Sequence, residues 1–204
     1  MTALFEHQPV VTLDLEDADI ELHEGFDCGF DSTILRHRVV QNTKWREESI
    51  TLFGKSYLQP RLFAWYGDQN AQYCYSGLTL QPAPWTSELS ALRDRLSAHC
   101  STAFNSVLLN YYRDHRDSMG MHADDEPELG SSPVIASLSL GETRDISFKH
   151  KHRKDVKTCR VPLKDSSLLV MRGQTQQHWK HGISKLSRPC GPRVNLTFRK
   201  ILPG

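Results

Sequence analysis

Short segments with strand character follow one another from Asn105 to the end of the 204-residue chain, separated by turn-forming residues. They lie at 106–112, 134–140, 145–149, 158–161, 168–171, 177–181 and 193–199. Many short strands joined by turns are typical of a β-sandwich, a jelly roll or a barrel, because each strand must bury a face against another layer. The sequence therefore predicts a mainly β fold, an α+β arrangement with helices as flanking elements.

The last of these segments has two unlike faces. Alternation along a strand sends successive side chains to opposite sides, here Val194, Leu196 and Phe198 against Arg193, Asn195, Thr197 and Arg199. Like charges on one face of a strand repel, so the two arginines indicate an anion between them. A planar guanidinium matches a carboxylate in a bidentate way, which favours a dicarboxylate ligand. An outer strand with a solvated polar face is the alternative.

Two helices are predicted in the first half of the chain, where capping residues precede apolar residues at helical spacing. The first begins at Asp31 and runs to about Asn42, and the second covers about 88–99. The residues expected to face the core are Ile34, Leu35 and Val39 in the first helix and Leu89, Leu92 and Leu96 in the second. Extended segments are expected at 48–53, 59–65 and 72–79, with a hairpin turn at Gly54-Lys55.

Composition limits the class of protein. With 38% hydrophobic and 24% charged residues, the chain has the make-up of one globular domain. Its five cysteines are scattered without a CxxC pair, which argues against a disulfide framework or a structural zinc site. This usage fits a reducing compartment, so we expect a cytoplasmic protein, or a nuclear one in a eukaryote. No apolar run reaches the length of a membrane span, and no membrane association is expected.

Charge is unevenly distributed along the chain. Residues 1–31 contain nine acidic residues and no lysine or arginine, and the remaining residues carry a net charge of +10. Residues 1–30 are predicted to form an irregular acidic arm whose apolar patch at 10–15 could pair with a sheet edge. The basic body suits a polyanionic partner. An arm that folds back and neutralises the surface is the alternative, and both can hold.

A metal-binding pattern occurs at His122-Ala-Asp124. On an extended segment, residues two apart face the same side, so both side chains reach one ion. Two imidazoles and one carboxylate make the facial triad of non-haem iron(II). The missing histidine is His178 or His181, which are three residues apart and cannot both face the ion. A similar His-x-Asp run at 115–117 lies in a polar stretch and is predicted to be a solvated turn.

Asn110 and Tyr112 repeat the pattern of the last strand. They share one face, while Leu109 and Tyr111 take the other. An amide and a phenol beside two arginines would bind carboxylate oxygens well. A half-buried strand with satisfied polar side chains is the alternative.

Taken together and in this order, the motifs resemble the AlkB family of iron(II)- and 2-oxoglutarate-dependent dioxygenases. The resemblance rests on His122-Ala-Asp124, Trp179-Lys-His181 and Pro192–Arg199, and it extends over residues 30–202. Further matching motifs are Gln59-Pro-Arg61, Ala64-Trp-Tyr66-Gly67, Phe104-Asn105-Ser106, Asn110-x-Tyr112, Asp124–Gly130 and Ala136–Gly141.

The resemblance implies a double-stranded β-helix, a cupin-like jelly roll with the metal inside. It implies one dioxygenase domain at 31–204, with a nucleotide-recognition lid at about 48–80. The catalytic iron ligands would be His122, Asp124 and His181. The 2-oxoglutarate site would consist of Asn110, Tyr112, His181, Arg193, Asn195, Thr197 and Arg199.

The activity implied is oxidative demethylation of N1-methyladenine and N3-methylcytosine in single- or double-stranded DNA, with O2 as oxidant and formaldehyde, succinate and CO2 as products. The substrate contacts implied are Phe53, Gly54, Lys55, Arg61, Tyr73, Cys74, Tyr75, Asp125 and Glu126. The two carboxylates would favour these positively charged bases. The aromatic pair would hold a base flipped out of the stack, and the phenylalanine hairpin would wedge into a duplex.

Three alternatives remain open at this point. The first is an RNA demethylase with the same chemistry. The second is a nucleic-acid-binding module that has lost catalysis, against which the intact ligand set argues. The third is a zinc hydrolase with the same ligands, in which the paired arginines would have no purpose. We expect the protein to be a monomer.

Overall fold

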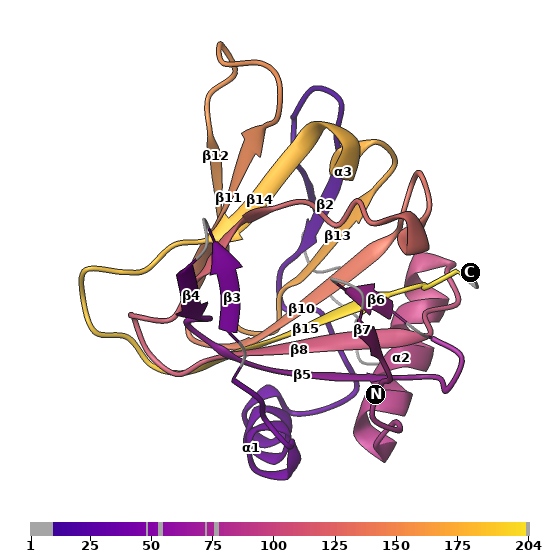
Figure 1. Cartoon of the computed structure of the whole chain (residues 1–204). Helices are drawn as coiled ribbons and strands as arrows, with labels where there is room; N and C mark the ends of the chain where they lie inside the picture. Colours follow the sequence, from indigo (N-terminus) through magenta and orange to yellow (C-terminus); the bar gives the residue numbers. More distant parts are fainter. Residues whose placement is uncertain (1–9, 48, 53–54, 72, 76–77, 203–204) are drawn as a thin grey trace, which may run out of the picture.

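Two antiparallel β-sheets face each other in the computed structural model, which describes residues 10–47, 49–52, 55–71, 73–75 and 78–202 (Figure 1). The major sheet has the strand order β1-β2-β13-β10-β15-β8-β5. Its strands are β1 Val10–Thr12, β2 Asp19–His23, β5 Leu62–Gly67, β8 Ser106–Tyr112, β10 Ile135–Gly141, β13 Leu168–Arg172 and β15 Arg193–Arg199. The minor sheet has the order β12-β11-β14-β9. Its strands are β9 Met119–His122, β11 Arg144–His150, β12 Cys159–Leu163 and β14 Trp179–Ile183. The mainly β, two-layered fold expected from the sequence is confirmed.

Strand β15 lies in the interior of the major sheet. It pairs with β10 on one side and with β8 on the other. All its residues are buried except Arg199, which is half-buried. The alternative of a solvated outer strand is therefore wrong, and the polar face of β15 points into the space between the sheets.

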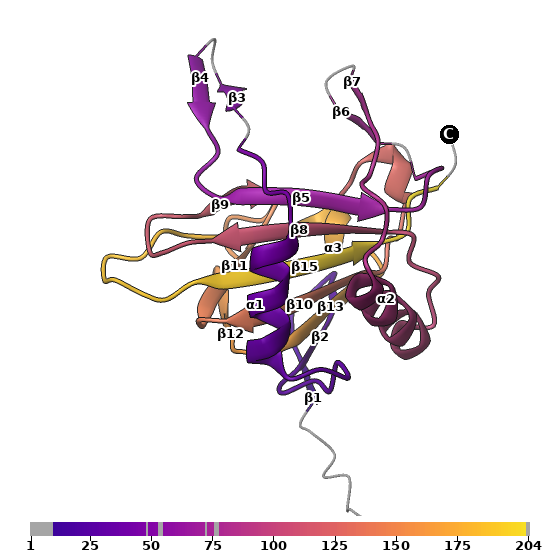
Figure 2. The same ribbon diagram turned by 90° about the horizontal axis from the view of Figure 1, so that it is seen from below.

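Two helices, α1 (Ser32–Asn42) and α2 (Ser87–Cys100), cover the outer face of the major sheet (Figure 2). Asp31 and Thr86 cap them, and each side chain accepts a hydrogen bond from the backbone N–H three residues on. The helices bury their apolar residues against β10 and β15 in one cluster that includes Leu35, Val39, Leu89, Leu92, Leu96, Leu138, Leu196 and Phe198. Both predicted helix ranges are confirmed to within one residue at each end.

A second apolar cluster fills the space between the two sheets. Its members include Ile20, Leu22, Ile135, Ile146, Phe148, Val161, Leu163, Leu169, Met171, Trp179 and Ile183. With helices on one side and the minor sheet on the other, both faces of the major sheet are covered. Polar side chains of β8, β10 and β15 that point between the sheets therefore lie among apolar neighbours.

The acidic arm is part of the major sheet. Strand β1 pairs with β2, and β2 pairs with β13. The prediction of an irregular arm is wrong for these strands, because Ile20 and Leu22 are buried between the sheets and the ladder to β13 satisfies their backbone. The expected pairing of the apolar patch with a sheet edge is confirmed. Acidic side chains of the arm also neutralise the body through the ion pairs Glu16–Arg153, Glu21–Arg172 and Glu24–Lys164.

Two hairpins project from the same side of the major sheet, beyond β5 (Figure 2). Strand β3 (Ser49–Leu52) pairs with β4 (Lys55–Leu58), so the predicted hairpin is present. The predicted position of Lys55 in its turn is wrong, because Lys55 begins β4 and pairs with Leu52. Strand β6 (Tyr73–Tyr75) pairs with β7 (Leu78–Leu80), so the single extended segment predicted over 72–79 is wrong. Phe53 and Gly54 lie outside the described residues.

The predicted strand over 177–181 is wrong in its first part. A short helix, α3 (Thr175–His178), precedes β14, which begins at Trp179. Thr175 is buried, and its hydroxyl donates a hydrogen bond to the carbonyl of Arg172. This contact turns the chain between β13 and β14. A 3-10 turn, η1 (Pro127–Leu129), follows the metal-binding motif.

Four cysteines, Cys28, Cys100, Cys159 and Cys190, have free thiols. Within the described residues, no helix combines the length and apolar character needed to cross a membrane.

Adjacent residues of α1 provide a matched test of the helix packing. The prediction that Ile34 faces inward is wrong, since it is 55% exposed, whereas Leu35 is 1% exposed. Leu35→Ala should lower the free energy of unfolding by about 2–5 kcal/mol, because it leaves a cavity under the helix. Ile34→Ala should change it by less than about 1 kcal/mol. Chemical denaturation of both variants measures the difference, and similar losses would contradict this packing.

Candidate active site

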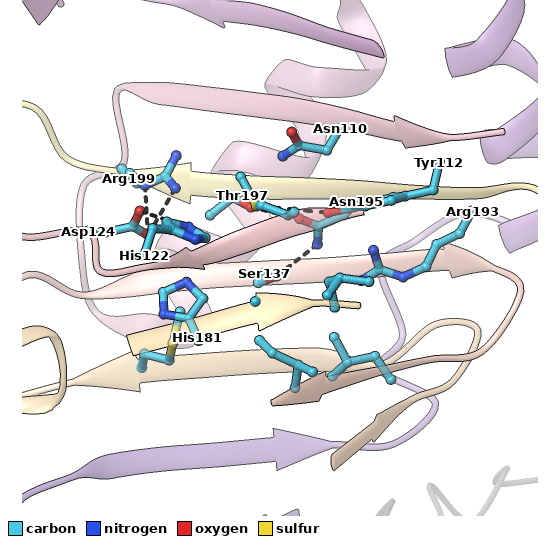
Figure 3. A pocket seen from close by; sticks show the side chains of 16 residues that line it. Asn110, Tyr112, His122, Asp124, Ser137, His181, Arg193, Asn195, Thr197 and Arg199 are labelled. Carbon is cyan, nitrogen blue, oxygen red and sulfur yellow. Dashed lines mark hydrogen bonds and ion pairs between the residues drawn. The ribbon is translucent and has the colours of Figure 1, made fainter. Parts of the chain in front are cut away.

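A pocket between the two sheets gathers the polar residues singled out by the sequence (Figure 3). Its polar lining consists of Asn110, Tyr112, His122, Asp124, Ser137, His181, Arg193, Asn195, Thr197 and Arg199. Its apolar lining includes Met119, Ile146, Leu163, Met171 and Ile183. Figure 3 shows the histidines and Asp124 with Arg199 at one end, and Arg193 with Tyr112 at the other.

His122, Asp124 and His181 form a group able to hold a metal ion. One ligand atom of each residue lies within 4.8 Å of those of the other two. His122 and His181 are cross-strand partners on β9 and β14, and Asp124 follows on the extended segment after β9. Two imidazoles and a carboxylate at these separations suit iron(II) with coordination positions left open.

Electrostatics keeps Asp124 and His181 in the protonation states that bind metals. Burial opposes ionisation of Asp124, but the Arg199 guanidinium and the two imidazoles outweigh it and lower the pKa of Asp124 to about 2. Arg199 donates two hydrogen bonds to Asp124 Oδ2, at 3.2 Å from Nε and 2.9 Å from Nη2. Burial, aided by His122, lowers the pKa of His181 to about 3, so its imidazole is neutral.

Contacts from neighbouring segments orient the ligands. The Nδ1–H of His122 donates to the carbonyl of Gly120 at 2.9 Å, so Nε2 carries the lone pair and faces Asp124 Oδ1 at 3.7 Å. Gln176 is buried on α3, and its Oε1 accepts from the backbone N–H of Asp124 at 3.0 Å. Gly182 allows β9 and β14 to approach closely, since a Cβ there would lie 2.9 Å from two β9 carbonyls.

The opposite end of the pocket contains an unpaired positive charge. Arg193 is 1% exposed, and its Nη2 donates to Ser139 Oγ at 3.0 Å. Its Nε and Nη1 have no hydrogen-bond partner among the described residues. Burial lowers the pKa of Arg193, because a buried cation without a counter-charge is unfavourable. A ligand carboxylate would satisfy these donors, so the residues present fit a dicarboxylate such as 2-oxoglutarate.

Between the two ends, polar side chains of β10 and β15 form hydrogen bonds with one another, and Asn110 on β8 is held by Arg61. Asn195 donates to Ser137 Oγ at 2.7 Å, and Thr197 donates to Asn195 Oδ1 at 2.9 Å. Arg61, expected as a substrate contact, donates from Nε to Asn110 Oδ1 at 2.7 Å and so lies beside the pocket. Because Arg61 engages the amide oxygen of Asn110, the amide nitrogen is the atom that can donate a hydrogen bond to a ligand.

The two carboxylates expected to contact a substrate base differ in their surroundings. Asp125 is exposed, and its Oδ2 accepts from Lys151 Nζ at 2.7 Å; the same Nζ donates to the carbonyl of Gln176. Glu126 is half-buried, and its side chain makes no capping hydrogen bond to η1. The other expected contacts lie on the hairpins, with Lys55 on β4 and the segment Tyr73–Tyr75 as β6.

A second group with metal-ligand residue types, Asp17, His150 and His178, has a different character. The backbone N–H groups of His152 and Arg153 donate to Nδ1 of His150 at 3.2 and 3.0 Å. A neutral ring with this acceptor carries its proton on Nε2, which faces Asp17 at 3.8 Å. That nitrogen is a donor and not a metal ligand, so the group is a polar contact between the arm, β11 and α3.

The segment 115–117, predicted to be a solvated turn, is a turn with a buried acid. Asp117 is 4% exposed and accepts hydrogen bonds from the backbone, Nε and Nη2 of Arg113 at 2.8–3.0 Å. The prediction that it is solvated is therefore wrong for Asp117, because the guanidinium replaces water around its carboxylate.

Comparison with known proteins identifies the group to which the chain belongs. Residues 32–199 match the sequence profile of the 2OG-Fe(II) oxygenase superfamily. The chain is 40% identical over 198 residues to DNA oxidative demethylase ALKBH2 of Mus musculus, covering 88% of this chain and 82% of the relative. It is 39% identical over 190 residues to alpha-ketoglutarate-dependent dioxygenase alkB homolog 3 of Mus musculus, covering 89% and 66%. The chain belongs to the AlkB family.

The AlkB-family fold extends over nearly the whole chain. The solved structure of OsALKBH1 superposes with a TM-score of 0.65 at 18% identity, covering 94% of this chain and 100% of that one. The resemblance stated from the motifs, and the jelly-roll fold that it implied, are both confirmed. The chain spans about two thirds of the length of the mouse alkB homolog 3.

Three polar residues that line this AlkB-family pocket or contact its lining residues were missed by sequence reasoning. Ser137 and Ser139 alternate with leucines on β10, and this alternation is a signal that could have placed them opposite Asn195 and Arg193. Gln176 carried no signal, because a glutamine in a polar run is indistinguishable from a solvated one until α3 is known.

The contact between Gln176 and Asp124 leads to a prediction about metal affinity. Gln176→Leu should weaken binding of Mn(II) by about 10–100-fold, because a ligand loses the contact that orients it. Titration followed by electron paramagnetic resonance measures the affinity. The matched control is Gln177→Leu, since Gln177 is exposed and donates only to the carbonyl of Ser131. Equal affinities of the two variants would contradict this role.

Proposed function

We propose that this chain is a DNA repair dioxygenase that oxidatively demethylates N-alkylated bases, including N1-methyladenine and N3-methylcytosine. The observation that carries the proposal is the pairing, in one pocket, of a His-Asp-His group with a buried arginine, Arg193, whose Nε and Nη1 have no hydrogen-bond partner among the described residues. The first suits iron(II) and the second suits a carboxylate. The name of the mouse relative, DNA oxidative demethylase ALKBH2, supports DNA as the substrate.

Different residues of the pocket would bind the iron ion and the far carboxylate of 2-oxoglutarate. His122, Asp124 and His181 would hold iron(II), and Arg193 with Tyr112 would hold the far carboxylate of 2-oxoglutarate. When bound, iron and 2-oxoglutarate with O2 supply the oxidation that converts an N-methyl group to formaldehyde, with release of succinate and CO2. Neither role requires a histidine to be charged.

The chain's own contribution is orientation and exclusion of water. Ile146, Leu163 and Ile183 place apolar side chains on the minor-sheet wall of the pocket. This wall keeps water from the polar contacts and strengthens them. On the other wall, Arg199 holds one oxygen of Asp124, which leaves the second carboxylate oxygen for the metal.

Recognition of a methylated base would depend on negative charge near the metal. N1-methyladenine and N3-methylcytosine carry positive charge, so a carboxylate distinguishes them from normal bases. Asp125 is engaged by Lys151, which offsets its charge. We therefore assign the larger part of this selection to Glu126 and regard Asp125 as the anchor of the loop.

The test is demethylation of oligonucleotides with either lesion in duplex DNA, single-stranded DNA and RNA. Purified protein with iron(II), ascorbate and 2-oxoglutarate should remove the methyl group from DNA and form equal amounts of succinate, as read by mass spectrometry. His181→Ala should reduce turnover to the level without enzyme, and the matched control His178→Ala should retain it. Demethylation of RNA but not of DNA would show that the substrate is RNA. If no oligonucleotide led to succinate formation, a nucleic-acid-binding module without catalysis would be favoured.

The two arginines of β15 should have separable effects. Arg193→Met should weaken 2-oxoglutarate binding by at least about 100-fold, because a buried carboxylate would lose its charged partner, and leave Mn(II) affinity unchanged. Arg199→Met should weaken Mn(II) binding itself, because Asp124 loses the group that holds its carboxylate. Calorimetric titration of each variant with Mn(II) and then 2-oxoglutarate distinguishes them. Identical profiles would refute the division of roles.

A further inference from the structure

Arg144 is a buried arginine that has no role in the metal, cosubstrate or base contacts of the proposed function. It lies at the start of β11, on the inward face that continues with Ile146 and Phe148, and it is 1% exposed. It does not line the pocket. A fully buried guanidinium is costly unless it is paired, so its presence requires an explanation.

Among the described residues, the hydrogen-bond acceptors of Arg144 are all backbone carbonyls. Nη1 donates to the carbonyl of Asp114 at 3.3 Å, and Nη2 donates to those of Asp117 at 2.9 Å and Ser184 at 2.5 Å. Its Nε has no hydrogen-bond partner in the described part of the chain. The side chain thus joins the turn between β8 and β9 to the end of β14, yet no carboxylate of the described residues forms an ion pair with it.

The nearby acids are already engaged. The Asp117 carboxylate accepts from Arg113 at 2.8 Å, and the Asp114 carboxylate accepts from Arg116 at 2.7 Å. The positive charge of Arg144 is therefore uncompensated where water cannot screen it. At a low effective dielectric constant, such a charge acts over several ångströms.

Tyr112 connects Arg144 to the pocket. The Arg144 guanidinium carbon lies 5.7 Å from the centroid of the Tyr112 ring, and that of Arg193 lies 5.1 Å from the same centroid. Tyr112 and Arg193 are cross-strand partners at the ends of β8 and β15. One aromatic ring is thus shared by two buried guanidinium groups, one from each sheet, and neither has a carboxylate partner among the described residues.

We propose that Arg144 is a positioning residue for the far carboxylate of the dicarboxylate cosubstrate, acting through its charge and through the Tyr112 ring. This inference rests on the proposed function and extends it. Without ligand, Arg144 and Arg193 repel each other across Tyr112. A carboxylate bound at Arg193 relieves this repulsion, so part of the affinity for a dianion comes from a residue that never touches it.

A purely structural role would make a different prediction. If Arg144 only joined the two turns, its loss would disturb every ligand of the pocket alike. If its charge matters, the loss must depend on the charge of the ligand. The ligand pair that separates these cases is 2-oxoglutarate and 2-oxopentanoate, which share a five-carbon chain and the 2-oxo acid group, whereas only the first has the far carboxylate.

The experiment measures dissociation constants of both acids for the 204-residue chain loaded with Mn(II), by isothermal titration calorimetry. Arg144→Met should weaken 2-oxoglutarate binding by at least about ten-fold and 2-oxopentanoate binding by less than about three-fold. Arg144→Lys keeps the charge and should remain within about three-fold of wild type for both. The control is Arg160→Met on β12, an exposed cation whose loss should alter neither affinity.

Each other outcome overturns the proposal. Equal losses for the two acids would assign Arg144 a structural role, and an unchanged 2-oxoglutarate affinity would assign it none. If Arg144→Met fails to fold, Arg144→Lys decides, because a folded lysine variant that binds 2-oxoglutarate more than ten-fold more weakly contradicts a role for charge. If the wild-type protein bound no 2-oxoglutarate, the proposed function itself would be refuted. This result differs from those that refute only the proposed role of Arg144.

Discussion

Positive charge buried between the two sheets is the constraint on which the site depends. Arg193 and Arg199 project from the same face of β15 into an interior walled by apolar side chains. A buried cation is tolerated when it is paired, and removal of one partner of such a pair typically costs 3–5 kcal/mol. Arg199 has a built-in carboxylate partner in Asp124, whereas Arg193 has a hydrogen bond to the Ser139 hydroxyl and the Tyr112 ring beside it, but no carboxylate partner among the described residues. The fold thus satisfies one arginine itself and leaves the other to a ligand.

The ion pair between Arg199 and Asp124 gives the aspartate two tasks. It offsets the cation at the end of β15, and its second oxygen faces the imidazole of His122. Because the aspartate is ionised at any pH near neutral, the metal-binding group needs no proton release from it. Strand register makes this possible, since His181 pairs with His122 and Arg193 with Tyr112. A shift of one residue would turn these side chains away from the pocket.

The parts that the sequence predicted well are those governed by local rules. Alternation in 193–199 separates the apolar face under the helices from the polar face at the pocket, and the leucine spacing of α2 follows from burial of one helix face; both appear in the structure. The choice between His178 and His181 needed the family resemblance. The sequence around 177–181 predicts one strand, and nothing in it indicates that helix α3 ends at His178. Contacts set by distant pairing were not predictable from local patterns, as for Gln176 on Asp124 and for β2 beside β13.

Arg193 and Arg199 lie too far apart on β15 for mutual repulsion to be the reason that they indicate an anion. Six residue steps along β15 place the Cα atoms of Arg193 and Arg199 about 20 Å apart, so direct repulsion between them is small. The two arginines mark opposite ends of one pocket, with Asn195 and Thr197 between them. A ligand that satisfies Arg193 and also reaches the metal group beside Arg199 must have an anionic group at each end. The pocket lined by β15 therefore selects a ligand by its length and by charge at both of its ends, and not by charge alone.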